Sequence, residues 1–138
     1  MSAESLALAF LVGGGAGWFL ENVATGEPRF SHAFGDARVP FLPVYGFGTA
    51  AIVAAAPRMG KVSAPIRFII YASGLSAIEL AACAVDRRTG DASWNYNCEG
   101  DFAECKRPEN LEGCVSWKHA AIWGALGLAV DAVARKIG

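Results

Sequence analysis

Ionisable side chains are scarce in this chain and are gathered in a few short stretches. Only 18% of its 138 residues are charged, 54% are hydrophobic, and the formal net charge is −1. No run of Lys or Arg is long enough to form the basic face that neutralises nucleic-acid phosphates. The composition therefore excludes a nucleic-acid partner and is unusually apolar for a soluble protein of this length.

Motifs of catalysis and cofactor binding are also missing. The sequence has no nucleophile elbow and no phosphate-binding loop, and His32 and His119 are its only histidines. The four cysteines lack the close spacing, or the histidine partners, of a zinc site. We therefore expect no enzyme activity, no cofactor and no metal. The alternative is an intramembrane enzyme that uses an acid with His119 for proton transfer.

Long apolar segments remain between the charged stretches. No ionisable side chain lies in 5–20 or in 120–130, and Glu79 is the only acid in 68–85. A membrane-spanning helix needs roughly 20 mostly apolar residues. We therefore expect an all-α, polytopic integral membrane protein, a single domain 1–138 with four transmembrane helices in an antiparallel bundle. The expected helices cover about 4–23, 41–57, 66–86 and 117–135, and a polar loop covers about 87–116. The alternative, a soluble bundle, needs polar outer faces that these segments lack.

Basic residues near the helix ends predict the orientation, because Lys and Arg concentrate in short cytoplasmic loops. One set of basic residues lies in the short connection after the second segment and at the end of the last segment. Because Lys and Arg are denser there than in the longer loops, this set predicts that both termini are cytoplasmic. The pair Arg87 and Arg88 at the end of the third helix opposes this orientation. The favoured cytoplasmic set is Arg58, Lys61, Arg67, Arg135 and Lys136.

Three of the four cysteines lie in the polar loop. If this loop faces an oxidising compartment, a bridge between Cys98 and Cys105 would close a short loop, and Cys114 is the alternative partner of either. Cys83 lies within the third helix. If the loop is cytoplasmic, we expect reduced thiols instead.

Two acids, Glu21 and Glu79, lie in otherwise apolar segments, each on a helix face that it shares with small or polar residues. Glu21 follows Gly13 and Gly17 at intervals of four residues, and small residues four apart let helix backbones approach closely in lipid. Glu79 shares a face with Cys83 and Asp86 and lies deep in an apolar segment. A buried ionised carboxylate is costly, so Glu79 must be protonated, paired or beside a wet cavity. Either a structural hydrogen bond or a role in transport or binding accounts for it.

The last segment also has a small face, and it carries a charge pair. Asp131 and Arg135 are four residues apart, which predicts an ion pair near the helix end. Aromatic residues elsewhere fit the belt that membrane proteins place at the bilayer interface, namely Trp18, Trp94, Trp117 and Tyr96. The small face consists of Ser116, Ala120, Gly124 and Gly127.

Five motifs occur in a fixed order along the chain: "GWFLENV", "FLPVYGFG", "IELAACAVD", "SWNYN" and "NLEGCVSWKHAAIWGALGL". Together they resemble the type IV ABC-transporter family of CmpB-like proteins, whose animal relatives are small transmembrane proteins. The resemblance implies that the family positions fall on Gly17, Trp18, Glu21, Pro43, Tyr45, Gly46, Gly48, Glu79, Asp86, Trp94, Tyr96, Asn110, Gly113, Trp123 and Gly124. From these we take Glu21, Glu79, Asp86, Trp18, Tyr45, Trp94, Tyr96 and Asn110 as the candidate binding or structural polar core.

The chain departs from the family pattern at two places. Asp86 stands where a glutamate is more usual, and "CEGDFAECKRPE" resembles an insertion before "NLEG". We expect a transport-related membrane subunit, permease-like or accessory, in which Glu21 and Glu79 meet at a polar pocket. No ATP-binding motif is present, so an ABC role needs a separate ATPase. The expected partners are membrane lipids and either a homo-oligomer or a larger membrane complex. The alternatives are a structural scaffold subunit and a small proton-coupled exporter.

Overall fold

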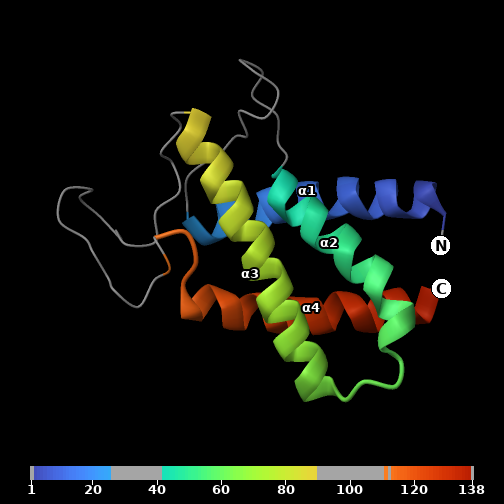
Figure 1. Ribbon diagram of the computed structural model, residues 1–138. Coiled ribbons are helices and arrows are strands. Elements are labelled where there is room, and N and C mark those ends of the chain that lie inside the picture. The colour runs from blue at the N-terminus through green and yellow to red at the C-terminus, as the bar shows by residue number, and fades with distance from the viewer. Residues whose placement is uncertain (1, 26–41, 90–110, 112, 138) are drawn as a thin grey trace. The chain divides into compact units, whose positions relative to one another are not determined.

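The structure is a computed structural model that describes residues 2–25, 42–89, 111 and 113–137. Within these residues the regular structure consists of four α-helices and one 3-10 turn (Figure 1). The all-α class and the order of the four expected helices are confirmed. The elements are α1 (Ala3–Thr25), α2 (Pro43–Ala55), η1 (Ala56–Met59), α3 (Ala64–Thr89) and α4 (Trp117–Ile137).

The chain divides into two compact units. The first unit contains Met1–Lys61 and Ala129–Gly138, and the second unit contains Val62–Leu128. The first unit therefore holds α1, α2, η1 and the end of α4, whereas the second holds α3 and the part of α4 up to Leu128. The single domain that the sequence predicts stays a prediction.

Local sequence explains where the helices begin and end. Ser2 caps α1, because its Oγ accepts a hydrogen bond from the backbone N–H of Ser5 at 3.2 Å. Pro43 is the first residue of α2, where its missing N–H costs nothing. Pro57 lies in η1, so α2 ends before it, at Ala55. The expected second helix at 41–57 is therefore too long, and the expected loop at 87–116 begins too early, because α3 continues to Thr89.

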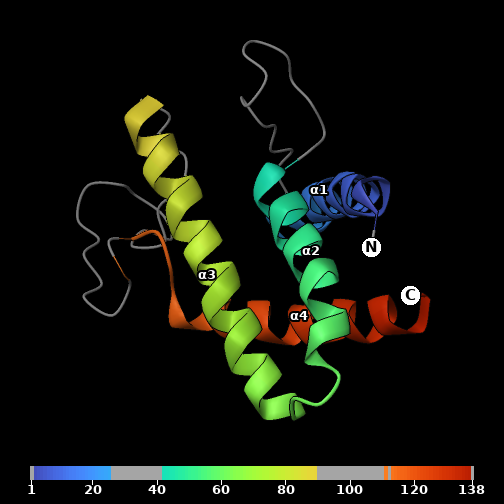
Figure 2. The same ribbon diagram turned by 45° about the vertical axis from the view of Figure 1, so that its right-hand side comes forward.

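In the first unit, glycines allow α1 and α2 to pack closely (Figures 1 and 2). A Cβ atom at Gly17 would overlap the side chain of Tyr45. A Cβ at Gly46 would lie 2.8 Å from the backbone oxygen of Phe10, which is closer than real Cβ contacts allow. A Cβ at Gly13 would lie 2.9 Å from the backbone oxygen of Tyr45. The predicted packing role of Gly13 and Gly17 is confirmed.

In the second unit, the close approach of α3 and α4 also depends on glycines. A Cβ at Gly124 would lie 2.6 Å from the ring of Phe68. A Cβ at Gly127 would lie 2.5 Å from the Cβ of Tyr71. The small face predicted for the last helix therefore receives aromatic side chains of α3.

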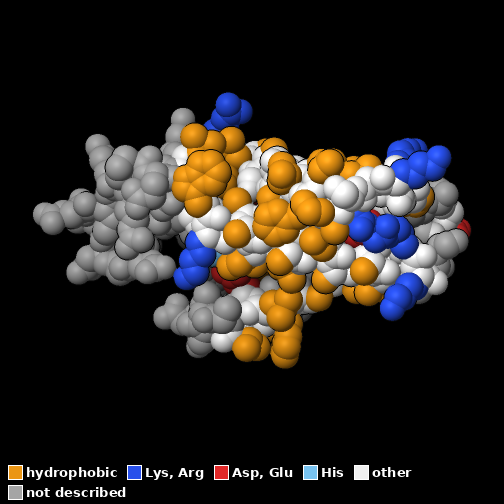
Figure 3. Space-filling model, turned by 90° about the horizontal axis from the view of Figure 1, so that it is seen from below, with side chains coloured by type: hydrophobic (Ala, Val, Ile, Leu, Met, Phe, Trp, Pro, Cys, Tyr) orange, Lys and Arg blue, Asp and Glu red, His pale blue; other side chains and the backbone are white. Residues whose placement is uncertain are grey.

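Large hydrophobic side chains are widely exposed on the helices (Figure 3, orange). Such exposure is costly in water, because burying apolar area is what stabilises a soluble fold. The side chains that are more than half exposed include Leu8, Leu11, Val12, Phe19, Leu20, Val23, Phe47, Ile66, Ile69, Val85, Leu111, Trp117 and Val133.

Two helices are long and apolar enough to cross a membrane. Ala3–Val23 in α1 and Ala64–Val85 in α3 meet this condition by length and composition. The 13 residues of α2 extend for about 20 Å, which is less than a bilayer core of roughly 30 Å. The combination of spanning length and apolar composition that the sequence predicts for four helices is thus found in two of the helices that the structure describes.

Candidate functional site

The largest fully buried side chains are not aliphatic. They belong to two acids, Glu79 and Asp131, and to two cysteines, Cys83 and Cys114. Acids in soluble proteins are almost never fully buried unless they are paired, and aliphatic side chains normally fill the core. Among the described residues, the largest side chains without exposed surface are therefore acids and cysteines. Glu79, Cys83 and Cys114 belong to the second unit and form its candidate site, whereas Asp131 belongs to the first unit and is described by itself.

Glu79 lies on the buried side of α3. Tyr71, Leu75, Glu79 and Cys83 follow one another at intervals of four residues, and none of the four is more than 6% exposed. Residues four apart are neighbours on one side of an α-helix. The carboxyl group of Glu79, at 0% exposure, therefore faces the interior of the second unit.

The hydrogen-bond partner of Glu79 comes from α4. Trp123 Nε1–H donates to Glu79 Oε2 at 3.1 Å, and the Trp123 side chain is itself buried. The indole N–H of tryptophan donates hydrogen bonds and accepts none. It therefore orients a carboxyl oxygen of Glu79 but cannot take up a proton from it. Hydrogen bonds to carboxylates are strong, and a low local dielectric strengthens them further. The arrangement can hold an acid inside the protein in one orientation.

Glu21 has a corresponding partner in the first unit. Tyr45 Oη donates to Glu21 Oε2 at 2.9 Å, and this pair is only partly buried. The Tyr45 ring lies against Gly17, one turn before Glu21, because Gly17 has no Cβ to displace it. The glycine stripe of α1 thus places the tyrosine hydroxyl next to the acid. Trp18, on the same helix, is half-buried.

Asp131 forms the predicted ion pair with Arg135. Arg135 Nη2 lies 2.7 Å from Asp131 Oδ2 on the same helix, with Asp131 buried and Arg135 about one-third exposed at 32%. The expected pair is confirmed. The buried acid therefore has its countercharge one turn away, toward the end of α4.

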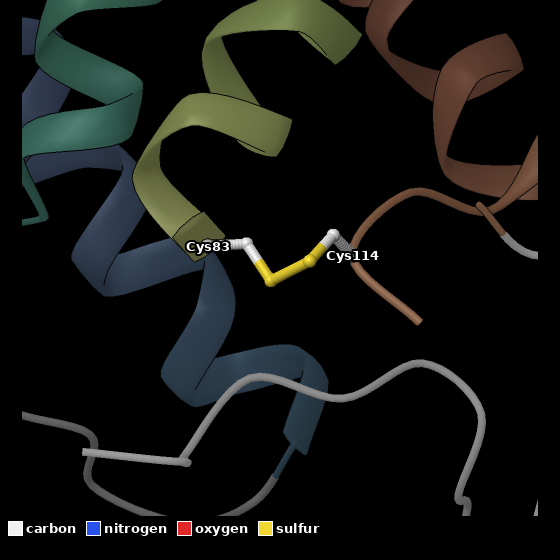
Figure 4. The surroundings of a disulfide bond; sticks show 2 residues. All are labelled: Cys83 and Cys114. Atoms are coloured by element: carbon white, nitrogen blue, oxygen red, sulfur yellow. A yellow bond between two sulfur atoms is a disulfide. The ribbon is translucent and has the colours of Figure 1, made fainter. Parts of the chain in front are cut away.

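Cys83 and Cys114 form a disulfide bond (Figure 4). Their Cα atoms lie 5.7 Å apart, and the two cysteines are 31 positions apart in the sequence. Cys114 as a partner of Cys98 or Cys105 is therefore wrong, because its sulfur is bonded to α3. The predicted Cys98–Cys105 bridge lies outside the described residues and stays a prediction.

A tight turn presents Cys114 to α3. The backbone N–H of Cys114 donates to the oxygen of Leu111 at 2.9 Å, and Leu111 forms a β-bridge with Val115. Gly113 has a φ of 74°, a left-handed conformation that glycine adopts without strain. The turn therefore explains the need for glycine in "NLEGC".

Ser116 then starts α4. Its Oγ accepts the backbone N–H of His119 at 3.2 Å, which is the contact of a helix N-cap. The same oxygen is hydrogen-bonded to Nδ1 of His119 at 2.7 Å. Ser116 and His119 thus fix the direction in which α4 leaves the turn.

The structure places the other predicted site residues as follows. Glu21 and Glu79 belong to different units, so their expected meeting at one polar pocket stays a prediction. Asp86 lies on α3, but its side chain is outside the described part of the structure. Three further residues of the predicted polar core lie outside the described residues, namely Trp94, Tyr96 and Asn110.

Sequence reasoning missed two contacts of the site. Trp123 is one of the family positions, but nothing in the sequence identifies it as the donor to Glu79. Its place beside Gly124 on the small face of the last helix was the available signal. Cys83 was likewise not paired, although it shares the face of Glu79. No group of three or more His, Cys, Asp or Glu that could hold a metal occurs among the described residues.

These features define an all-α protein with two helices long and apolar enough to cross a membrane and with a buried acid, Glu79, that accepts a hydrogen bond from an aromatic donor. The model of the family described as Putative ABC-transporter type IV matches residues 8–137, which is nearly the whole chain. The chain therefore belongs to this family. Searches of the curated proteins and of the solved structures found no significant match.

Proposed function

We propose that the protein is an integral membrane subunit of a transport system, permease-like or accessory, with all four helices in the bilayer. Glu79 is the central functional group in this proposal, and Glu21 is the second. The role is not catalytic and uses no cofactor. Membrane lipids surround the protein, and its partners are further copies of the chain or the other subunits of a larger complex.

The distribution of polar and apolar side chains supports a membrane location. Large hydrophobic side chains are exposed along the helices, whereas Glu79 and Asp131 are fully buried. In hydrocarbon, exposed apolar side chains cost nothing, and acids are found facing the interior of a helix bundle. The short α2 is compatible with this location, because incomplete helices occur at membrane depth where protein covers them.

The burial of Glu79 is the observation that carries the transport role. An ionisable group at membrane depth is expensive and commonly marks an ion or substrate pathway. Membership of the family supports the same class of function. Because the sequence has no phosphate-binding loop, the proposed system obtains ATP hydrolysis from a separate ATPase subunit.

The disulfide supports the proposed orientation. Disulfides persist in oxidising compartments and are rare in the cytosol. Cys83 near the end of α3 and Cys114 before α4 would therefore lie on the non-cytoplasmic side. Arg58 and Lys61, before α3, would then be cytoplasmic, which agrees with the positive-inside rule and with cytoplasmic termini.

Membrane residence and transport are tested one after the other. The expressed chain should stay in the membrane pellet through alkaline carbonate washing, and a chain that remains monodisperse without detergent would overturn the proposal. Purification in mild detergent should then recover an ATPase subunit, identified by mass spectrometry. The recovered complex is reconstituted into liposomes and assayed with a panel of labelled inorganic ions, amino acids and sugars.

The variant Glu79→Gln keeps the size of the side chain and removes its ability to ionise. The proposal expects normal assembly with greatly reduced flux of any solute that the wild-type complex carries. Unchanged assembly together with unchanged flux would remove Glu79 from the function. Glu4→Gln is the matched control, because Glu4 lies in the exposed first turn of α1.

A scaffold subunit is the second candidate, favoured by the hydrogen bonds that each acid makes to an aromatic side chain of the neighbouring helix. In this role Glu21 and Glu79 only fix how the helices pack. A stable partner of fixed stoichiometry, with assembly but no flux depending on Glu79, would favour it. A proton-coupled exporter remains the other alternative, and proton release from the purified protein on addition of the transported solute would favour that.

A further inference from the structure

The part of α3 that carries Glu79 is linked at two points to α4 and to the turn that precedes it. The first is direct, because Trp123 Nε1–H donates to the carboxyl group of Glu79. The second is covalent, because Cys83, one helical turn after Glu79, is bonded to Cys114, nine residues before Trp123. The donor and the acceptor are thus linked through a short path that crosses the disulfide.

This short path is held by hydrogen bonds along its length. The turn at Leu111–Val115 is closed by backbone hydrogen bonds, and Ser116 caps the first turn of α4. From Trp117 onward the path is continuous α-helix. Fixing Cys114 on α3 therefore fixes the start of α4, and with it the position of the Trp123 indole.

Without the disulfide, the covalent path from Cys83 to Cys114 runs through the intervening chain, across a sequence separation of 31, and Glu79 and Trp123 are 44 positions apart along the chain. A longer connection lowers the effective concentration of one end at the other, because closing it costs more conformational entropy. The glycine contacts at Gly124 and Gly127 would remain, but they lie on the far side of Trp123 from the disulfide. The beginning of α4 is therefore the part that loses its restraint.

The disulfide is itself protected. Cys83 is 0% and Cys114 1% exposed, so thiols in solution reach the bond poorly. Exposed or strained disulfides are the ones that serve as labile redox switches, whereas shielded ones are lasting structural links. Burial thus favours a permanent positioning role.

We propose that the Cys83–Cys114 disulfide is a positioning element of the Glu79 site, which holds Trp123 on the carboxyl group and keeps that group closed to water. The use of Glu79 in transport rests on the proposed function. The positioning itself requires no transport and is measured on the purified chain in detergent.

The experiment measures access of water-borne reagents to Glu79. A water-soluble carbodiimide activates an accessible carboxyl group, glycine ethyl ester then forms an amide with it, and the carbodiimide leaves as a urea. Peptide mass spectrometry quantifies this product at Glu79 and, as an internal reference, at Glu21. The parent carries Cys98→Ser and Cys105→Ser, so that only the Cys83–Cys114 bond can form.

Adding Cys83→Ser and Cys114→Ser to this parent should raise the labelling rate of Glu79 roughly tenfold or more, because local opening governs access to a buried group. Labelling of Glu21 should not change, because Glu21 and its donor Tyr45 belong to the first unit, whereas the disulfide belongs to the second. Unchanged labelling of Glu79 would overturn the proposal. An equal rise at Glu21 would also overturn it, since that result means general loosening.

The variant Trp123→Phe tests whether the disulfide acts through the indole. Alone, in the parent with its disulfide intact, it should raise Glu79 labelling, and combining it with the two serine variants should add little. Fully multiplicative effects would mean that the disulfide acts independently of Trp123 and would overturn the positioning role.

If the serine variants lose helix content by circular dichroism, the same measurement is made on the folded parent. Reduction with a phosphine, which takes up oxygen from water as the disulfide becomes two thiols, should raise Glu79 labelling, and reoxidation should reverse the rise. No change on complete reduction would overturn the proposal. Loss of the transport function in other experiments would leave all these outcomes intact, so the two proposals fail separately.

Discussion

The α1·α2 pair and the α3·α4 pair make the same kinds of contact but differ in how deeply these contacts are buried in the protein. In each pair, glycines of one helix receive an aromatic side chain of the other, and an acid accepts a hydrogen bond from an aromatic residue across the contact. Tyr45 and Glu21 are partly buried, whereas Trp123 and Glu79 are buried. Only the second pair has a disulfide among the described residues.

The location of the disulfide matches the free-energy cost of a buried acid that loses its hydrogen-bond donor. Glu79, at 0% exposure, cannot exchange its Trp123 donor for water, so loss of this donor removes a hydrogen bond that water does not replace. The partly buried Glu21 can replace its donor with water. The covalent link therefore occurs where a misplaced donor would be most harmful.

The largest expected effect comes from removing the Cys83–Cys114 disulfide, which is the covalent difference between the two pairs. Cys83→Ser combined with Cys114→Ser should lower the free energy of unfolding by roughly 3 to 4 kcal/mol, because the bond closes a long loop. Unfolding by sodium dodecyl sulfate in mixed micelles measures this change. A loss below about 1 kcal/mol would show that the disulfide adds little to the second pair.

The next effect tests the glycines that the pairs share. Gly17→Ala should destabilise the chain by about 1 to 3 kcal/mol, because the new methyl group overlaps the near end of the Tyr45 side chain. Gly15→Ala is the matched control on the same helix, since no atom lies within 4 Å of its Cβ position. The control should be neutral or stabilising by up to about 1 kcal/mol from helix propensity.

The same comparison extends to the second pair. Gly124→Ala meets the ring of Phe68, whereas Gly74→Ala on α3 meets nothing within 4 Å. Equal stability of a contact variant and its control would contradict the packing role of that glycine. Thermal unfolding in detergent gives the ranking of all four variants.

The third effect separates the two aromatic donors. Trp123→Phe should cost about 1 to 3 kcal/mol, because it leaves a fully buried carboxyl group without this donor. Tyr45→Phe should cost about 0.5 to 1.5 kcal/mol, because the partly buried Glu21 can bind water instead. Chemical unfolding of both variants in the same detergent measures the difference in the free energy of unfolding. A larger loss of stability for Tyr45→Phe would contradict the idea that burial of the acid decides the cost.

The sequence predicted much of the helical frame. Charge-free segments indicated the four helices, the spacing of Gly13, Gly17 and Glu21 identified the side of α1 that packs on α2, and the Asp131–Arg135 spacing predicted the ion pair. These features are local, because they depend only on the 3.6-residue period of a helix. The expected helix at 41–57 is longer than α2, because it starts two residues before Pro43 and includes Pro57. Pro43 is the first residue of α2, and Pro57 lies in the 3-10 turn that follows it.

The contacts of Glu79 could not be predicted in the same way. Disulfide partners must bring their Cα atoms within about 7 Å, and that distance depends on how distant helices pack. Cys83 lies in an apolar helix, where a free buried thiol is equally common, so its sequence context did not indicate a bond. The Trp123–Glu79 hydrogen bond likewise joins residues 44 positions apart through a contact between helices.

The smallest expected effect compares two helix caps of the same design. Ser2 accepts the backbone N–H of Ser5, and Ser116 accepts that of His119, each at 3.2 Å. Ser116→Ala should cost about 1 kcal/mol, because its cap is 8% exposed and sets the start of a helix that carries Trp123. Ser2→Ala should cost less, since Ser2 is exposed and water can satisfy the freed N–H groups at the end of the chain. Because the cap is one step in the path from the disulfide to Trp123, Ser116→Ala should also shift the indole N–H resonance of Trp123, whereas Ser2→Ala should not. Equal losses of stability and an unmoved indole resonance would mean that the disulfide alone, and not the cap, fixes the start of α4.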